Sequence, residues 1–210
     1  MKGKLIIFSG FSGTGKGTIM NELLKRYPEE FCLSVSATTR SPREGEKEGV
    51  AYFFKTRDEF EEMISKGEFL EYAEYVGNYY GTPRSYVEER LNEGKNVFLE
   101  IEMQGAMKVK AKMPEAALVF ILPPSIKILA ERLSGRGTNT EEDIRQRMNQ
   151  ASREAEGMTR YDYFVINDDL EKCITDVKNL AQGNIPDDLP DESFLKNIKD
   201  ELDSMLKGDL

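Results

Sequence analysis

The sequence contains no histidine and only two cysteines, and these absences exclude several kinds of site. Without an imidazole there is no histidine base, no His-containing catalytic triad and no histidine-rich metal centre. Cys32 and Cys173 are too few for a disulfide framework and lack the spacing of zinc ligands. We expect both to be buried thiols in a protein of a reducing compartment.

Long apolar runs are also missing. No segment approaches the roughly 20 apolar residues that are needed to cross a bilayer. The apolar run within residues 1–8 is too short for the core of a signal peptide. We therefore expect a cytoplasmic protein with no membrane partner.

Acidic residues are in excess, with 38 Asp and Glu against 29 Lys and Arg, which gives a net charge of −9. A chain this acidic is a poor match for nucleic-acid polymers or anionic membranes. Residues 184–210 hold eight acids and three lysines, so this tail carries −5 and the rest of the chain −4. The net charge therefore says little about the local potential in the body of the protein.

Short apolar runs alternate with amphipathic segments along most of the chain. The expected strands are residues 5–8, 97–101, 118–122 and 163–166. The expected helices are residues 15–25, 104–112, 126–133, 141–156 and 170–180. Uninterrupted apolar strands followed by helices predict an α/β fold, with a parallel sheet core flanked by helices.

Three segments depart from this alternation. Residues 36–86 place strand-like pieces at 50–54 and 69–75 around a short helix at 58–66, which predicts a small insert with antiparallel strands. Residues 135–140 lie between two helices and predict a mobile loop. The acidic tail has an apolar helical face, which we expect to pack on the domain, on a neighbouring subunit or on a dedicated partner. That face consists of Phe194, Leu195, Ile198, Leu202, Met205 and Leu206.

A glycine-rich segment follows the first expected strand and opens the first helix. Its residues are Gly10, Phe11, Ser12, Gly13, Thr14, Gly15, Lys16 and Gly17. The glycines let successive N–H groups approach a polyphosphate, the helix amino end adds its dipole, and Lys16 supplies a charge to the outer phosphates. This predicts ATP or GTP binding, and the alternative is a turn that only joins a strand to a helix. Gly17 stands where such loops normally have the Ser or Thr that ligates magnesium, so Thr18 is the candidate metal contact.

Arg40 and Arg43 lie three residues apart on a segment that Pro42 keeps out of a helix. Arginine forks bind phosphate oxygens bidentately, and the hydroxyls of Tyr52 and Tyr80 can donate to the same group. This pattern predicts a site for one terminal phosphate. Taken alone, such a pair is more often solvated surface charge.

Glu71, on an expected strand, and Ser36, which we expect to end another, suit a guanine base. A fixed carboxylate accepts from both N1–H and the 2-amino group of guanine. Adenine has an acceptor at N1 and no such amino group, so the carboxylate would be left unpaired.

Several segments together resemble guanylate kinase, in order and at matching spacing, over roughly residues 4–182. They are Thr38-Thr-Arg-Ser-Pro-Arg43, Phe69-Leu-Glu-Tyr-Ala73, Gly77-Asn-Tyr-Tyr-Gly-Thr82, Glu100-Ile-Glu-Met-Gln-Gly105, Ile121-Leu-Pro-Pro-Ser125 and Gly135-Arg-Gly-Thr138. The resemblance implies the fold of a P-loop nucleoside monophosphate kinase. Its parts would be a core at 1–35 and 84–183, a mixed α+β GMP-binding insert at 36–83, a helical lid at about 134–147 and the tail at 184–210.

The resemblance also implies a reaction, in which ATP and GMP (or dGMP) give ADP and GDP (or dGDP) with Mg²⁺, in purine nucleotide metabolism and GMP recycling. The substrates would be the only partners, and the protein a monomer or homodimer. Carried over by position, Arg40, Arg43, Tyr52 and Tyr80 would bind the GMP phosphate, and Ser36, Glu71 and Thr82 the guanine, with Glu102 nearby. Glu100 and Glu102 stand where many members have Asp. Glu100 ends a hydrophobic strand, where its carboxylate would bind magnesium-bound water.

Transfer to a phosphate oxygen needs no strong base, because the second pKa of a monophosphate is near ~6. The protein then contributes only alignment of the substrates and neutralisation of charge on the phosphates. The candidates for this role are Lys16, Arg132, Arg136 and Arg147. A surface role is the alternative for the three arginines. Asn167, after the strand at 163–166, would frame the adenine by resemblance, or else cap the next helix.

Two other functions compete. Guanylate-kinase-like modules of scaffolds bind phosphopeptides but tend to lose the phosphate loop and its lysine, which this chain retains. A kinase for a ribose bisphosphate would have no use for the guanine-reading Glu71 and Ser36.

Overall fold

The computed structural model describes residues 2–135 and 140–208, which form two compact units. The first unit contains the chain up to Ile7 together with Tyr27–Ala116, and the second contains Phe8–Arg26 and the chain from Ala117 onward. The expected insert, 36–83, lies within the first unit, which also includes part of the expected core. The roles assigned to those ranges stay predictions.

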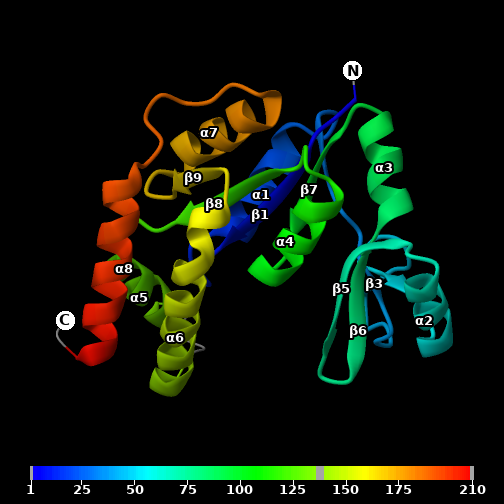
Figure 1. Cartoon of the computed structure of the whole chain (residues 1–210), viewed down its shortest axis with the longest axis horizontal. Coiled ribbons are helices and arrows are strands. Elements are labelled where there is room, and N and C mark those ends of the chain that lie inside the picture. The colour runs from blue at the N-terminus through cyan, green and yellow to red at the C-terminus, as the bar shows by residue number, and fades with distance from the viewer. Residues whose placement is uncertain (1, 136–139, 209–210) are drawn as a thin grey trace. The chain divides into compact units, whose positions relative to one another are not determined.

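Strand β1 (Leu5–Gly10) supplies residues to both units. The other elements of the first unit are β2 (Phe31–Leu33), β3 (Ala37–Thr38), β4 (Phe53–Phe54), α2 (Arg57–Ser65), β5 (Phe69–Tyr75), β6 (Asn78–Pro83), α3 (Arg84–Asn92), β7 (Asn96–Glu100) and α4 (Met103–Lys112) (Figure 1). Those of the second are α1 (Lys16–Arg26), β8 (Ala117–Leu122), α5 (Ile126–Ser134), α6 (Glu141–Gly157), the 3₁₀ turn η1 (Met158–Arg160), β9 (Tyr163–Ile166), α7 (Leu170–Gln182) and α8 (Glu192–Lys207). Within the described ranges, none of these helices combines the length and the apolar character of a membrane span.

The main sheet is built from parallel pairs. Strand β2 pairs in parallel with β7, and β8 pairs in parallel with β9. The strand order of the sheet is β2-β7-β1-β8-β9. Leu5–Phe8 and Leu118–Leu122 are almost completely buried, as in parallel strands with helices over both faces. The α/β class expected from the sequence is therefore confirmed.

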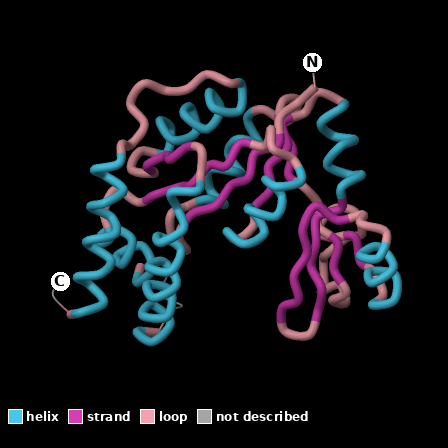
Figure 2. Tube along the Cα trace, in the orientation of Figure 1, coloured by secondary structure: helices cyan, strands magenta, loops and turns pink. Residues whose placement is uncertain are grey.

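A second, four-stranded sheet in the first unit has the order β4-β3-β6-β5. It is mixed, because β3 and β4 are parallel whereas β5 and β6 form the long antiparallel hairpin that Figure 2 shows. The ring of Phe60 of α2 stacks with those of Phe69 and Tyr79, at centroid distances of 4.3 and 5.2 Å. This aromatic core fixes β5 against α2.

One expected strand of this sheet is shorter than the sequence suggests. Residues 49–51 form a turn in which Val50 is 72% exposed, and β4 begins only at Phe53. The apolar character of Val50 is therefore not a sign of burial. The expectation for the cysteines is likewise right for Cys173, which is buried, and wrong for Cys32, which is half-buried.

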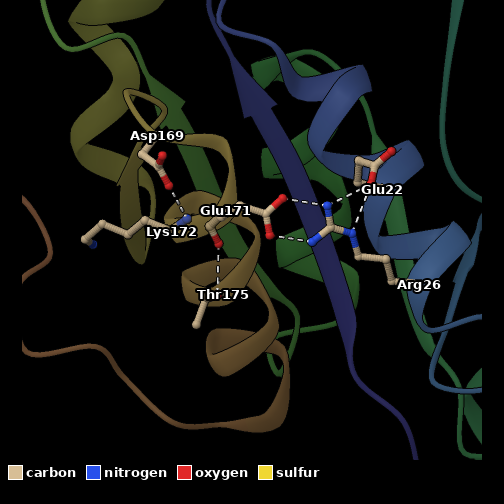
Figure 3. Close-up of polar contacts among 6 residues, drawn as sticks. All are labelled: Glu22, Arg26, Asp169, Glu171, Lys172 and Thr175. Carbon is tan, nitrogen blue, oxygen red and sulfur yellow. Dashed lines mark hydrogen bonds and ion pairs between the residues drawn. The ribbon is translucent and has the colours of Figure 1, made fainter.

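In the second unit a surface ion pair joins α1 to α7. The Arg26 guanidinium donates to both carboxylate oxygens of Glu171, at 2.6 Å each, and to Glu22 one turn earlier on α1, as Figure 3 shows. The guanidinium lowers the pKa of the Glu171 carboxyl. Because the pair is exposed to solvent, it orients the two helices more than it stabilises them.

The acidic tail forms α8, which packs on α5 and α6 in the second unit (Figure 1). Leu195, Ile198 and Leu202 are buried in this contact. The Glu201 carboxylate accepts the backbone N–H of Ile126 at 2.7 Å. The N-cap Ser125 accepts the N–H of Ile128, so side chains from two elements satisfy the first turn of α5.

We predict that Glu201→Ala lowers the free energy of unfolding by about 1 kcal/mol, because the N–H of Ile126 loses its capping partner. Urea denaturation of both proteins measures the difference. Asp203→Ala, on the exposed face of α8, is the matched control and should stay within about 0.5 kcal/mol of the parent. Equal stabilities of the two variants would contradict a capping role.

Candidate active site

The glycine-rich segment forms a strand–loop–helix turn in the second unit, from β1 into α1. Thr14 is fully buried, and its hydroxyl donates to the Phe11 carbonyl at 2.9 Å, which closes the loop on itself. The first turn of α1 contains no acidic residue, so its N–H groups and dipole are not neutralised from within the helix. This is the arrangement that binds phosphate groups at a helix amino end.

Two glycines of the loop are required by close approach as well as by backbone conformation. Gly10 has a φ of +149°, and a Cβ there would lie 2.4 Å from the Ile121 carbonyl oxygen of β8. Gly15 has a φ of +85°, and a Cβ there would lie 2.5 Å from the side-chain nitrogen of Asn167. Gly17 differs, because a Cβ at that position would meet nothing within 4 Å. The absence of Ser or Thr at Gly17 is therefore not imposed by packing.

Lys16 is the first residue of α1, and its ammonium lies over the loop. Its Nζ donates to the carbonyls of Gly10 at 2.6 Å and Phe11 at 3.0 Å. The cation is thus positioned at the loop, as the sequence predicts.

Asn167, at the end of β9, binds the loop from the side. Its side-chain NH₂ donates to the Thr14 carbonyl at 2.7 Å, and the residue is buried. The alternative of a helix cap is wrong, because α7 is capped by Asp169, whose carboxylate accepts the N–H of Lys172 (Figure 3). The contact with the loop is one that the sequence did not predict.

The three candidate arginines have different surroundings. Arg147, on α6, donates to the Ser12 hydroxyl of the loop at 2.6 Å, so α6 brings a guanidinium to the phosphate loop. Arg132 is half-buried in the last turn of α5, where its positive charge acts to lower the pKa of the Cys173 thiol. Burial raises the pKa of that thiol to about 12, which makes it unreactive at neutral pH. Arg136 lies outside the described residues.

The two expected metal contacts belong to different units. Thr18 is exposed in the first turn of α1, and the Glu100 carboxylate is exposed at the end of β7. A hydroxyl and a carboxylate are oxygen donors of the kind that Mg²⁺ prefers, so these residues fit that ion. Within the described ranges, no group of three or more carboxylate or thiol residues is clustered as a metal cage.

A carboxylate is buried in the first unit, at a bend of β5. Glu71 is only 9% exposed, and its Oε1 accepts the hydroxyl of Thr82 at 2.7 Å. Burial raises the pKa of Glu71, whereas the Thr82 hydroxyl and the charges of Lys108 and Lys112 lower it. The carboxylate lines a cavity of about 400 Å³, together with Tyr72, Tyr80, Glu102, Gln104 and Lys108 among others.

A second cluster in the first unit contains Arg40, Tyr52 and Tyr80, whereas the side chain of Arg43, the fourth expected phosphate ligand, is exposed. The Arg40 guanidinium lies 5.4 Å from the centroid of the Tyr52 ring, and the Tyr52 and Tyr80 rings meet edge to face at 6.0 Å. Glu46, which the sequence did not single out, binds Nη2 of Arg40 at 2.8 Å and the backbone N–H of Arg43 at 2.7 Å. Tyr80 belongs to this cluster and to the cavity that Glu71 lines.

The remaining predicted residues are placed less closely. Ser36 precedes β3 and does not end a strand, because β2 stops at Leu33. Its carbonyl accepts the N–H of Phe53. Glu102 occupies the N-cap position of α4 without a side-chain capping bond, and is exposed at the cavity. Lys108 lines the same cavity, and the sequence analysis does not predict it as a site residue. The one feature of the sequence that could have indicated it is its position in the second turn of the helix that begins after Glu102.

Known proteins that resemble this chain point to one family. The profile of the guanylate kinase family matches residues 2–183. A guanylate kinase of Halalkalibacterium halodurans is 53% identical over 180 residues, which are 86% of this chain and 88% of that protein. One of Streptococcus thermophilus is 51% identical over 182 residues, 87% of each chain.

A crystal structure of guanylate kinase from Anaplasma phagocytophilum is similar in fold, with a TM-score of 0.64 and 34% identity, over 87% of this chain and 86% of that one. The fold, the phosphate loop and the profile match agree. This chain belongs to the guanylate kinase family.

Proposed function

We propose that the protein transfers the γ-phosphoryl group of ATP to GMP or dGMP, giving ADP and GDP or dGDP. The observation that carries this proposal is the buried Glu71 carboxylate, bonded to Thr82 in a cavity of the first unit. A buried carboxylate is expensive unless it is paired. Guanine offers N1–H and the 2-amino group to such an acceptor, and no other common base offers both donors at that edge.

ATP binding is assigned to the phosphate loop of the second unit. The N–H groups of residues 10–18 and the amino end of α1 would bind the phosphates, and Lys16 would exchange its loop carbonyls for the outer phosphate oxygens. Arg147 already contacts the loop at Ser12, so its charge is available to the transferring group. Arg132 and Arg136 are further candidates from the sequence. Asn167 supports the loop through Thr14 and would lie near the adenine.

The GMP phosphate is assigned to Arg40, Arg43, Tyr52 and Tyr80. The contact of Glu46 with both arginines orders the loop that carries them before any phosphate arrives. Guanine is assigned to Ser36, Glu71 and Thr82, with Glu102 nearby. Tyr80 links the two sets, since it contacts Tyr52 and lines the cavity.

The transfer forms a bond between a GMP phosphate oxygen and the γ-phosphorus while the bond to the ADP oxygen breaks. The attacking oxygen is already mostly ionised at neutral pH, so no general base is required. The protein contributes alignment, cations and exclusion of water. This explains how a chain without histidine supports the reaction.

Mg²⁺ is assigned to Thr18 and Glu100, with water between ion and carboxylate. Held there, Mg²⁺ would supply positive charge to the phosphates of ATP. Thr18 and Glu100 would serve only to orient the ion, and both are exposed oxygen donors.

We place the reaction in the cytoplasm, with the protein as a monomer or homodimer in purine nucleotide metabolism and GMP recycling. The two free thiols support a reducing compartment. Both substrates are small metabolites, and no nucleic-acid polymer or membrane partner is proposed.

A coupled assay with ATP and a panel of acceptors tests the assignment. GMP and dGMP should be phosphorylated, because both present the guanine edge, and AMP, UMP and dTMP should not. A preference for AMP, or no turnover of GMP, would contradict the proposal.

Glu71→Gln should lower kcat/KM for GMP by about 10- to 100-fold, because the amide replaces one acceptor by a donor that faces the guanine donors. The KM for ATP should stay the same. Glu62→Gln, an identical change on the exposed face of α2, is the control. An equal loss in both variants would point to a general effect of charge rather than to base recognition.

Lys16→Met should reduce kcat by at least about 100-fold without unfolding the protein, because the loop loses its cation but keeps its backbone. Steady-state kinetics and circular dichroism measure the two properties. Lys25→Met, on the exposed last turn of the same helix, should keep normal activity. A fully active Lys16→Met variant would refute the assigned role of the loop.

A further inference from the structure

One face of α4 lies along the part of β5 that contains Glu71. Gly105, Lys108 and Lys112 follow one another at spacings of three and four residues, so they share a helix face. Helix α4 packs against β5 in the first unit. The three residues meet the strand at Glu71, Tyr72 and Phe69.

Strand β5 is irregular at this point. Its register against β6 shifts between Phe69, which lies opposite Pro83, and Tyr72, which lies opposite Gly81. A shift of this kind interrupts the ladder of hydrogen bonds and turns a side chain in a new direction. Glu71 lies inside the irregular segment, so its direction depends on what fixes the backbone on either side.

The two lysines bind that backbone on both sides of Glu71. Lys112 Nζ donates to the Phe69 carbonyl at 2.9 Å, and Lys108 Nζ donates to the Tyr72 carbonyl at 3.4 Å. Backbone carbonyls displaced from a ladder need other donors, and an ammonium is a strong one. The bulged segment is thus bound to α4 at both ends.

The glycine of the same face brings the helix close to the carboxylate itself. A Cβ on Gly105 would lie 3.2 Å from Oε2 of Glu71. That carboxylate oxygen therefore lies against the first turn of α4, where the helix dipole favours negative charge. The other oxygen, Oε1, accepts the Thr82 hydroxyl.

We propose that Lys108 and Lys112 are positioning residues for guanine recognition: bound to the carbonyls that flank Glu71, they maintain its carboxylate in the orientation and charge state that the base requires. The inference rests on the proposed function and names residues of the same site. Neither lysine contacts the reacting phosphates in this assignment. Their effect on the base is transmitted through Glu71.

The charges around Glu71 support this role. Burial raises its pKa, and the two lysines with Thr82 are the groups that lower it. Besides Lys108, the other polar side chains that line the cavity are Tyr72, Glu74 and Tyr75 of β5, Tyr80 of β6 and, at the start of α4, Glu102 and Gln104. Because two of these are acids, the lysines are the cations that favour ionised Glu71 in the described surroundings.

Removal of either lysine should raise the pKa of Glu71. Removing a lysine leaves the effect of burial less opposed, so the pKa of Glu71 rises further and the carboxyl gains its proton at a higher pH. A protonated carboxyl cannot accept from both N1–H and the 2-amino group. The acid limb of kcat/KM for GMP should therefore move to higher pH, whereas a lysine that serves only packing would leave the limb unmoved.

The test compares Lys108→Met, Lys112→Met and the double variant with the parent, in a coupled assay from pH 5 to 8. We expect the KM for GMP to rise about tenfold in the double variant, with kcat and the KM for ATP unchanged. The acid limb should move up by roughly half a pH unit. The titration of GMP itself is the same for every variant and does not contribute to the difference.

Lys66→Met is the matched control, since it removes a lysine from exposed α2 in the same unit. It should leave the KM for GMP, kcat, the KM for ATP and the acid limb of kcat/KM unchanged. Lys112→Arg keeps a charged donor and should restore most of the affinity for GMP. If Lys112→Met is poorly folded, Lys108→Met, at an exposed position, provides the same pH readout.

The inference is overturned if folded lysine variants keep the parent's KM for GMP, or if that KM rises with an unmoved acid limb. An active parent with unaffected variants would leave the proposed function intact and refute only the role of the lysines. A parent that fails to phosphorylate GMP would refute both.

Discussion

The second unit depends on how closely other elements approach the turn between β1 and α1. The Ile121 carbonyl and the Asn167 side chain occupy the space that side chains at Gly10 and Gly15 would need. Because the loop has no side chains at these points, Ile121 of β8 and Asn167 at the end of β9 can pack directly against its backbone. The contact of Arg147 with Ser12 adds a cation to a loop whose shape is already fixed.

The first unit contains a buried carboxylate, that of Glu71. A buried carboxylate opposes folding, yet Glu71 is buried beside Thr82 and under α4. A site built from such a group rejects ligands that leave it unpaired, so in the proposed function the buried carboxylate would discriminate between bases at a cost in stability. The aromatic core around Phe60 supplies the apolar burial that offsets it in the small sheet.

Contiguous motifs were predictable from the sequence, and contacts made by tertiary packing were not. The phosphate loop and Glu71 each stand in a short local pattern whose chemistry can be inferred directly, whereas Arg40 is assigned only together with the other motifs of the resemblance. Asn167 was expected to cap a helix or frame adenine, but its bond to Thr14 joins residues 153 positions apart. The sequence does not indicate a role for Glu46 or for the lysines of α4, because charged surface residues are common. The register shift in β5, which gives the lysines their role, cannot be predicted from composition. Val50 was misread because an apolar residue in a turn looks like part of a strand.

The contact between Glu201 and Ile126 spans 75 positions, and Glu201 lies beyond the residues that the family profile covers. During synthesis, α5 leaves the ribosome long before its capping carboxylate is made. The N–H of Ile126 must then be satisfied by water until α8 has been made and has packed on α5. The first unit is complete by Ala116, so it can fold before the capped form of α5 exists.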